Sequence, residues 1–394
     1  MAPPSAQYRV PAAPPPILDE DLADILSRDI HWETYLTARL ISDRDVQLLR
    51  RYDKRSEELQ SSLLDENGPM YVDAFLSVLR NVTKEETVQY VLALLAQMLA
   101  ANPARAQLFH QLPEGHSADP YTVFLRLLQR QDWFTQDKAC RVLSQIIAAR
   151  PPRPFGAPSA GGAARGSEGG GGVAAEPSEV AVAALVDWLC GQLRRPTNPT
   201  KSVPCAAAAL ATALREKSAR VLFTRGGGVQ LLSPLLRSCN TPANSQLLYE
   251  ICLCLWQLSY HKPAAEAMAG SGAVKGLVDV VKGAQKEKVV RVGLLALRNL
   301  LEDESLGLAP DMVEAGLQKV VAQRGLQSWG DEDIPAILDY LSEGLKKGVT
   351  VMSSFDKYKK EVMSGMLDWT PSHTSDLFWR QNIDKFEEKD FQVI

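Results

Sequence analysis

The sequence predicts an all-helical repeat protein, and three observations lead to that prediction. Apolar residues recur three and four positions apart along most of the chain, which is the spacing of one face of an α-helix. No stretch of comparable length alternates apolar and polar residues, as a half-buried strand would. One apolar signature also returns several times at a nearly constant interval. With 45% hydrophobic and 23% charged residues, the 394-residue chain has the composition of a folded protein.

Five segments of seven residues share this apolar signature. They are Ala93–Leu99, Arg141–Ile147, Ala208–Leu214, Leu253–Ser259 and Leu295–Leu301. From one equivalent position to the next, the intervals are 48, 67, 45 and 42 residues. The long interval contains 155–175, a tract of Gly, Ala and Ser without helical periodicity, and without these 21 residues the interval is 46. A second element follows the same period, because Val229, Val274 and Leu317 are 45 and 43 residues apart.

A period of 42–48 residues with two or three helices per unit is the signature of armadillo and HEAT repeats. Each unit buries one face against its neighbours, so we expect a right-handed superhelical solenoid with a long concave surface of the kind that binds proteins. Residues 17–348 are assigned to this repeat domain. Within it, 155–175 is expected to be a flexible loop insertion, because the entropy of loop closure grows slowly with length. Residues 1–16, rich in Pro and Ala, are expected to be disordered.

The first predicted helix begins with an acidic turn at residues 19–21, which favours a helix N-terminus. Its apolar face consists of Leu22, Ile25, Leu26 and Ile30. Two interpretations of this face are open. It caps the first repeat, since terminal repeats need atypical caps, or it is an element that docks onto a binding partner.

Several helix boundaries are predicted from local chemistry. Ser42–Asp45 and Thr83–Glu86 each have the sequence of a capping box, in which the first and fourth residues bond each other's backbone N–H groups. The last helix of the array is predicted over Ile334–Leu345. Basic residues followed by glycine, Lys346–Gly348, predict its end.

The composition changes after the predicted array. We expect a linker at 349–354 and, over 355–394, a small and apparently incomplete helical segment that is too short to bury a core of its own. Trp369 and Trp379 lie in this segment. Either they hold it against the last repeat, or they are exposed.

A glycine-rich stretch, Gly270–Gly276, resembles a damaged dinucleotide-binding fingerprint. Its third glycine is one place late, and a helical repeat precedes it where a strand is required. Gly226–Gly228 occupies the matching place one repeat earlier. Both stretches are therefore predicted to be turns between helices.

The search for chemical motifs predicts no catalytic residue, no cofactor and no metal site. The six cysteines have no CxxC spacing and are expected to be reduced structural thiols. The five histidines are scattered, and His110 and His116, in a predicted loop, are expected to be solvated. The net charge of −4, with neither half strongly basic, excludes an extended nucleic-acid footprint. No apolar stretch is long enough to suggest direct membrane insertion.

Several stretches of the chain resemble the H subunit family of the vacuolar proton-pumping ATPase (V-ATPase). They are Arg28–Ser42, Leu48–Lys54, Lys84–Pro103, Asp132–Pro151 and Ser353–Asn382. The last of them resembles the most recognisable stretch of the family. Family members continue beyond the position that corresponds to Ile394 through further helical repeats, so the resemblance implies a truncated C-terminal domain.

The resemblance implies a non-catalytic regulatory subunit that couples ATP hydrolysis to proton transport. Its expected partners are the peripheral stalk, the catalytic sector and the cytosolic part of the membrane sector. Its expected location is the cytoplasm, peripherally associated with vacuolar and endomembrane surfaces through the complex.

The alternative is a generic armadillo-repeat adaptor that binds peptides or proteins on its concave face. Importin-type arrays hold an extended peptide with a ladder in which each Trp lies one helical turn before an Asn. Here the residue one turn before Asn299 is Leu295, and Trp256 directly precedes Gln257. That ladder is therefore absent from the sequence.

Overall fold

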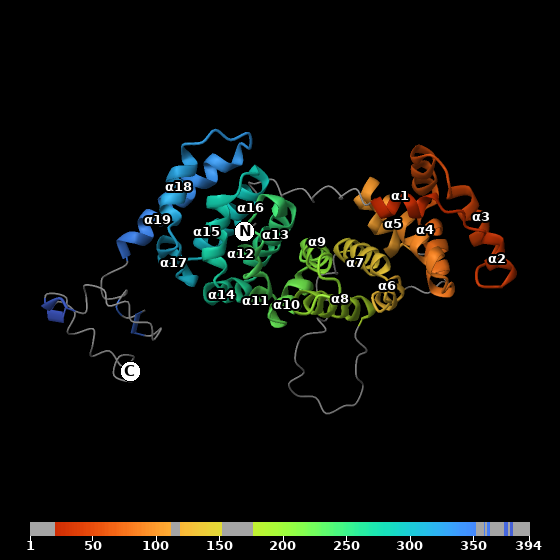
Figure 1. Cartoon of the computed structure of the whole chain (residues 1–394), viewed down its shortest axis with the longest axis horizontal. Coiled ribbons are helices and arrows are strands. Elements are labelled where there is room, and N and C mark those ends of the chain that lie inside the picture. Colours follow the sequence, from red (N-terminus) through yellow and green to blue (C-terminus); the bar gives the residue numbers. More distant parts are fainter. Residues whose placement is uncertain are drawn as a thin grey trace, which may run out of the picture.

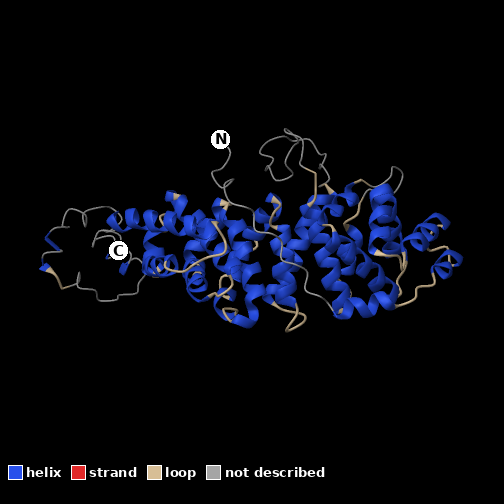
Figure 2. Cartoon of the chain, turned by 90° about the horizontal axis from the view of Figure 1, so that it is seen from above, coloured by secondary structure: helices blue, strands red, loops and turns tan. Residues whose placement is uncertain are grey.

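The computed structural model describes residues 20–111, 119–151 and 176–351, together with scattered positions between 358 and 380. The described part is an elongated array of helices without a strand (Figures 1 and 2), and the all-α fold predicted from periodicity is confirmed. The predictions for residues 1–16, for 155–175 and for most of 355–394 lie outside the described residues.

One layer of the array consists of long helices that stack in chain order, each against the next. They are α5 (Glu85–Ala101), α7 (Trp133–Ala148), α9 (Ser202–Ala213), α13 (Ser245–Ser259), α16 (Glu287–Glu302) and α19 (Asp333–Val351). The five seven-residue signatures lie in the first five of these helices. Their apolar residues are buried because each helix packs against two neighbours in its own layer and against the second layer.

The second layer is built from helices of varied length that cover the first. They are α4 (Glu57–Asn81), η2 (Pro103–His110), α6 (Thr122–Leu127), α8 (Pro177–Arg194), α10 (Lys217–Arg225), α11 (Gly228–Leu232), α12 (Leu235–Ser238), η3 (Pro242–Asn244), α14 (Lys262–Gly270), α15 (Ala273–Gly283), η4 (Glu304–Leu306), α17 (Ala309–Glu314) and α18 (Leu317–Gly325). Figure 1 shows α6, α8, α10, α11 and α14 along one edge of the array.

Three short helices precede the repeats: α1 (Glu20–Ser27), α2 (Trp32–Thr37) and α3 (Asp43–Tyr52). The capping box predicted at the start of α3 is confirmed, because the Ser42 hydroxyl accepts from the Asp45 N–H while the Asp45 carboxylate accepts from the Ser42 N–H. The second predicted box is wrong. Helix α5 begins one residue later than predicted, with Lys84 in the cap position and no side-chain cap bond.

In each of three successive repeats, a glycine turn separates two helices of the second layer, and such turns were predicted from the sequence. Gly227, Gly272 and Gly316 each precede a helix of the second layer and have φ values of 74°, 76° and 83°. These left-handed backbone conformations favour glycine because other residues place Cβ against the following carbonyl. The glycine-rich stretch at 270–276 is therefore a turn of the solenoid.

The last helix of the array extends past its predicted end. Helix α19 continues to Val351, so the stop predicted at Lys346–Gly348 is wrong, and residues 349–351 of the expected linker are helical. Within α19, Leu341 and Leu345 are fully buried, and the helix packs on α16.

Candidate partner-binding surfaces

The apolar face of α1 is covered within the chain itself. Helix α1 packs against α5, with Ile25 buried and Leu22 and Leu26 partly buried against the hydrophobic core. Ile30, which was predicted to share this helical face, lies beyond the end of α1 at Ser27 and is also partly buried. This geometry is that of a cap on the first repeat. Docking of the same face onto a partner would require α1 to leave α5, and it stays a prediction.

A single carboxylate holds the N-terminal helices onto the array. Asp53 accepts a hydrogen bond from the indole N–H of Trp32 at 3.0 Å and another from the hydroxyl of Tyr90. Both donors belong to buried side chains. Lys54 adds a bond of 2.8 Å from its ammonium to the carbonyl of Leu26 in α1. The first three helices are thus tied to α5 by polar bonds as well as apolar contact.

The structure describes only one of the two tryptophans that were predicted as candidate contacts. Trp379 is 37% exposed, and its ring packs edge-on against Tyr358 at a centroid distance of 5.3 Å. Trp369 lies outside the described residues. Whether either tryptophan contacts a partner stays a prediction.

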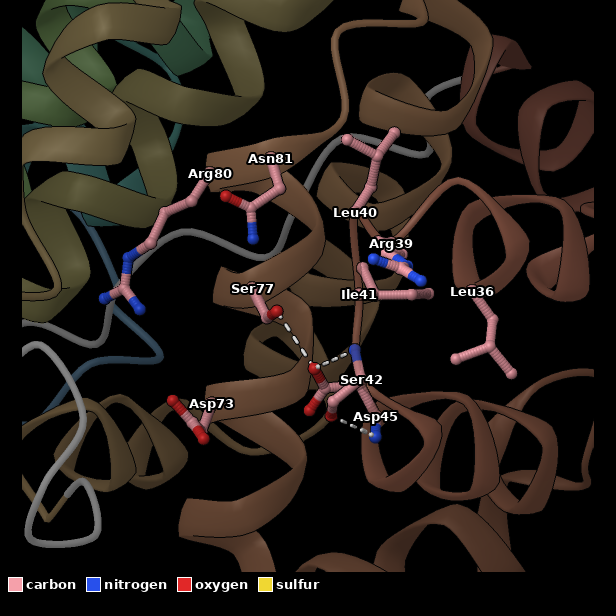
Figure 3. Close-up of a pocket in the computed structure, with 10 residues that line it drawn as sticks. All are labelled: Leu36, Arg39, Leu40, Ile41, Ser42, Asp45, Asp73, Ser77, Arg80 and Asn81. Carbon is pink, nitrogen blue, oxygen red and sulfur yellow. Dashed lines mark hydrogen bonds between the residues drawn. The ribbon is translucent and has the colours of Figure 1, made fainter.

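A polar pocket of about 440 Å³ lies between the α2–α3 connection and α4 (Figure 3). Its floor includes the buried carboxylates of Asp45 and Asp73. Ser77 donates to Asp45 at 3.0 Å, and Arg44 approaches Asp73 at 4.0 Å. The full lining is Leu36, Arg39, Leu40, Ile41, Ser42, Asp45, Asp73, Ser77, Arg80 and Asn81.

The pocket has the chemistry of a recognition surface. It combines carboxylates, guanidinium groups and three aliphatic side chains, and the hydroxyl of Ser77 is already committed to Asp45. At its rim, Arg39 has a φ of 56°, a left-handed conformation that is uncommon for a side-chain-bearing residue. The sequence indicated only the capping box at Ser42, because residues of the α2–α3 connection and of α4 meet here through the fold.

Two side-chain amides of the long helices form hydrogen bonds inside the array. The amide of Gln257 donates to the carbonyl of Ala211 in α9 at 2.9 Å, and the amide of Asn299 donates to the hydroxyl of Ser259 in α13 at 2.9 Å. Each bond joins one repeat to the preceding one. These amides thus hold neighbouring repeats together, which agrees with the absence of an importin-type ladder in the sequence.

The structure corrects the expectation for His110. It is half-buried in η2 rather than solvated, with Nε2 2.9 Å from the carbonyl of Ile146 in α7 and Nδ1 3.4 Å from the hydroxyl of Tyr121. Burial is the main cause that lowers the pKa of His110, and the charge of Arg150 adds to it. His116, its expected companion, lies outside the described residues.

All six cysteines are buried free thiols, as the sequence analysis expected. Burial raises the pKa of Cys190 to about 11 and that of Cys252 to about 12. Thiols with such values are poor nucleophiles and poor metal ligands at neutral pH. Among the described residues, no group of three His, Cys, Asp or Glu side chains could hold a metal ion.

No helix in the described part of the chain is long and apolar enough to cross a membrane.

Comparison with known families accounts for nearly the whole chain. A family model for the H subunit of the V-ATPase matches residues 16–345, and a second model with the same description matches residues 351–394. The chain belongs to the V-ATPase H subunit family. The resemblance inferred from sequence motifs is therefore confirmed.

Individual relatives support the same assignment. A probable V-type proton ATPase H subunit from Oryza sativa subsp. japonica is 46% identical over 94% of this chain and 80% of its own length. The V-type proton ATPase H subunits of Dictyostelium discoideum and Drosophila melanogaster are 33% and 31% identical, over 94% and 96% of this chain and 77% and 75% of their own lengths.

Solved structures resemble the fold. A designed armadillo repeat protein superimposes with a TM-score of 0.51 at 16% identity, and an engineered protein with a TM-score of 0.52 at 18% identity. Each comparison covers 70% of this chain and 99% of the other. As a member of the H subunit family, the chain thus has an armadillo-like fold.

Proposed function

We propose that the chain is a non-catalytic regulatory subunit of the V-ATPase that binds the peripheral stalk and couples ATP hydrolysis to proton transport. The observation that carries the proposal is the family match, which spans residues 16–345 and 351–394. Identity of 46% to a relative over most of both chains is consistent with a shared role.

The architecture supports a binding role. A solenoid presents a large surface on a frame whose repeats are each packed against the next, so it can contact several subunits at once. A binding module regulates a rotary machine by contacting some of its conformational states more favourably than others, which shifts the populations of those states. This mechanism needs no catalytic side chain in the chain itself.

The proposed partners are the peripheral stalk, the catalytic sector and the cytosolic part of the membrane sector. Through them the chain would lie on the cytoplasmic face of vacuolar and other endomembranes. The described helices contain no membrane span, so other subunits would provide the attachment.

The test adds the purified chain to V-ATPase membranes that lack their own H subunit and follows ATP-dependent acidification. Restored pumping is the expected result. Binding that restores ATP hydrolysis without pumping would retain the stalk-binding part of the proposal and refute the coupling part.

Failure of the folded chain to bind these membranes would refute the proposal and favour the armadillo adaptor. Circular dichroism establishes whether the chain is folded. The hydrogen bonds that occupy the amides of Gln257 and Asn299 argue against an adaptor that holds an extended peptide with those two groups.

A further inference from the structure

A cluster of cations on and just before α10 stands out in a chain whose net charge is −4. We call it the basic edge, and it consists of Arg215, Lys217, Arg220 and Arg225. Helix α10 contains no acidic residue. It lies beside α8, α11 and α14 along the edge of the array seen at the bottom of Figure 1.

Helix α10 packs against α14, which begins just after His261. Burial lowers the pKa of His261, and the charges of Arg220, Lys217 and Arg225 add to it. Arg220 donates to the carbonyls of Leu214 at 2.7 Å and Arg215 at 2.9 Å. Arg220 is therefore held by the fold, and the basic edge lies on and just before one helix, next to α14 of the following repeat.

The fold does not neutralise this charge. Among the described residues, the side chains of Arg215, Lys217 and Arg225 are exposed and have no ion-pair partner. Glu216 lies between two of them, but it pairs with Arg150 at 3.1 Å. Lys217 also occupies the first turn of α10, where the helix dipole disfavours a cation. The arrangement costs stability, which is typical of residues retained for binding.

An exposed aromatic group lies at the end of α13, directly before the α14 that packs against α10. Tyr260, adjacent to His261, is 45% exposed, and its ring packs edge-on against Trp256 at 5.5 Å. Tyr, Trp and Arg are the residues that most often dominate binding energy at protein interfaces. The aromatic pair lets a partner bury apolar area beside the charges.

We propose that the basic edge and Tyr260 form a docking surface for an acidic helical segment of a partner protein. A helix with carboxylates three and four positions apart places them along one face, and that face can meet Arg215, Lys217 and Arg225 while an apolar side chain covers Tyr260. The inference rests on the proposed function only for the source of that helix, another component of the V-ATPase.

The composition favours a protein over a lipid surface. Three of the four cations are arginines, whose planar guanidinium groups bind carboxylates in pairs of hydrogen bonds. Segments that bind anionic membranes are typically lysine-rich tails or amphipathic helices with a broad apolar face. Helix α10 instead buries Ala219 and Phe223 inside the repeat, so it has no free apolar face for insertion.

The test measures binding of a helical peptide of alanine and glutamate to the full chain, with a glutamine-for-glutamate peptide as the neutral probe. The variant is the triple charge reversal Arg215→Glu, Lys217→Glu, Arg225→Glu. Its matched control is Lys275→Glu, Lys282→Glu, Lys319→Glu, which reverses three exposed lysines on α15 and α18. Arg220 is left intact because it bonds the backbone.

The expected result is binding of the glutamate peptide alone, weakening as salt is raised because screening shortens the range of the charges. The basic-edge variant should bind about tenfold to a hundredfold less tightly, as three exposed charge contacts would give, and the control variant should bind like the wild type. Equal binding by the two variants would refute the proposal. A second outcome would also refute it. In that outcome the wild type binds phosphatidylserine vesicles but not the peptide, and the basic-edge variant no longer binds the vesicles.

The same variants in the membrane assay separate this inference from the proposed function. If the wild-type chain fails to bind V-ATPase membranes that lack their H subunit, the proposed function fails, whatever the peptide result. If the wild type binds and the basic-edge variant binds equally well, the proposed function stands and the acidic helix is not supplied by this complex.

Discussion

Asp53 offers a direct test of how the N-terminal helices are attached. The substitution Asp53→Ala removes the acceptor shared by the indole N–H of Trp32 and the hydroxyl of Tyr90. These donors belong to side chains that are 3% and 1% exposed, so neither can turn to bulk water without unpacking. The helices α1 to α3 should therefore be less firmly held, while the distant repeats should be unaffected.

The expected loss of free energy follows from the two donors, on Trp32 and Tyr90, that lose their acceptor. A buried donor that loses its acceptor costs about 1–3 kcal/mol. Asp53 is itself partly exposed, so water can replace some of the lost bonding. We expect a total loss of about 2–4 kcal/mol in the free energy that opens α1 to α3, which corresponds to at least roughly a 30-fold loss of amide protection.

Hydrogen exchange is the appropriate assay, because a repeat array can open at one end without unfolding as a whole. Asp43→Ala, at the start of the helix α3 that Asp53 directly follows, is the matched control. It removes an exposed carboxylate near the helix N-terminus, which is worth about 0.3–1 kcal/mol. If amides over residues 20–37 keep the same protection in Asp53→Ala as in the control, the attachment does not depend on this carboxylate.

Three further predictions concern stability and reactivity. Because the pKa of His110 is lowered by folding, the unfolded chain binds a proton more readily, so the free energy of unfolding should fall as the pH drops from about 7 through the folded pKa. In denaturant titrations at several pH values, His110→Gln should reduce that dependence, and an unchanged dependence would contradict this role. Gly272→Ala, at a φ of 76°, should destabilise the array by about 1 kcal/mol. Gly270→Ala, with open space around its Cβ position, should be neutral or slightly stabilising, and equal losses would refute the conformational argument. The buried thiols, including Cys190 and Cys252 with pKa values raised to about 11 and 12, should react with a thiol reagent at neutral pH only in denaturant, and fast reaction of the native chain would contradict their burial.

The repeat architecture was predictable because it depends on a local pattern. Segments such as Ala93–Leu99 and Leu295–Leu301 have the same apolar spacing. A helix with that spacing buries its apolar face by packing against neighbouring helices. The glycine turns were equally predictable. The backbone at Gly227 and Gly272 requires a positive φ, and few other residues adopt it at low cost.

The two errors at helix ends are boundaries predicted from local signals alone. At the start of α5, the carbonyl of Thr83 accepts a bond from Arg130 at 3.2 Å, and the cap position passes to Lys84, which pairs with Glu86 at 2.8 Å. At the end of α19, burial of Leu345 against the array accompanies a helix that continues through Gly348. Local signals of about 1 kcal/mol are outweighed when packing favours another boundary.

The contacts of the His110 side chain also could not be predicted from a local sequence pattern. Its position in a predicted loop suggested solvation, yet the carbonyl of Ile146, 36 positions later, lies within hydrogen-bonding distance. No local pattern reports such a contact, because it forms only when η2 packs on α7.

The helical content, the repeat period and the family could be predicted from the sequence, because each depends on residues close together in the chain or on long matching stretches. The packing of the helices in three dimensions sets which surfaces remain for partners. It covered the face of α1, brought Asp45 and Asp73 to one pocket and left Arg215, Lys217 and Arg225 exposed without carboxylate partners among the described residues. The physical reason is that exposure and charge pairing are properties of neighbours in space, and in a solenoid those neighbours come from repeats about 40 or more residues away.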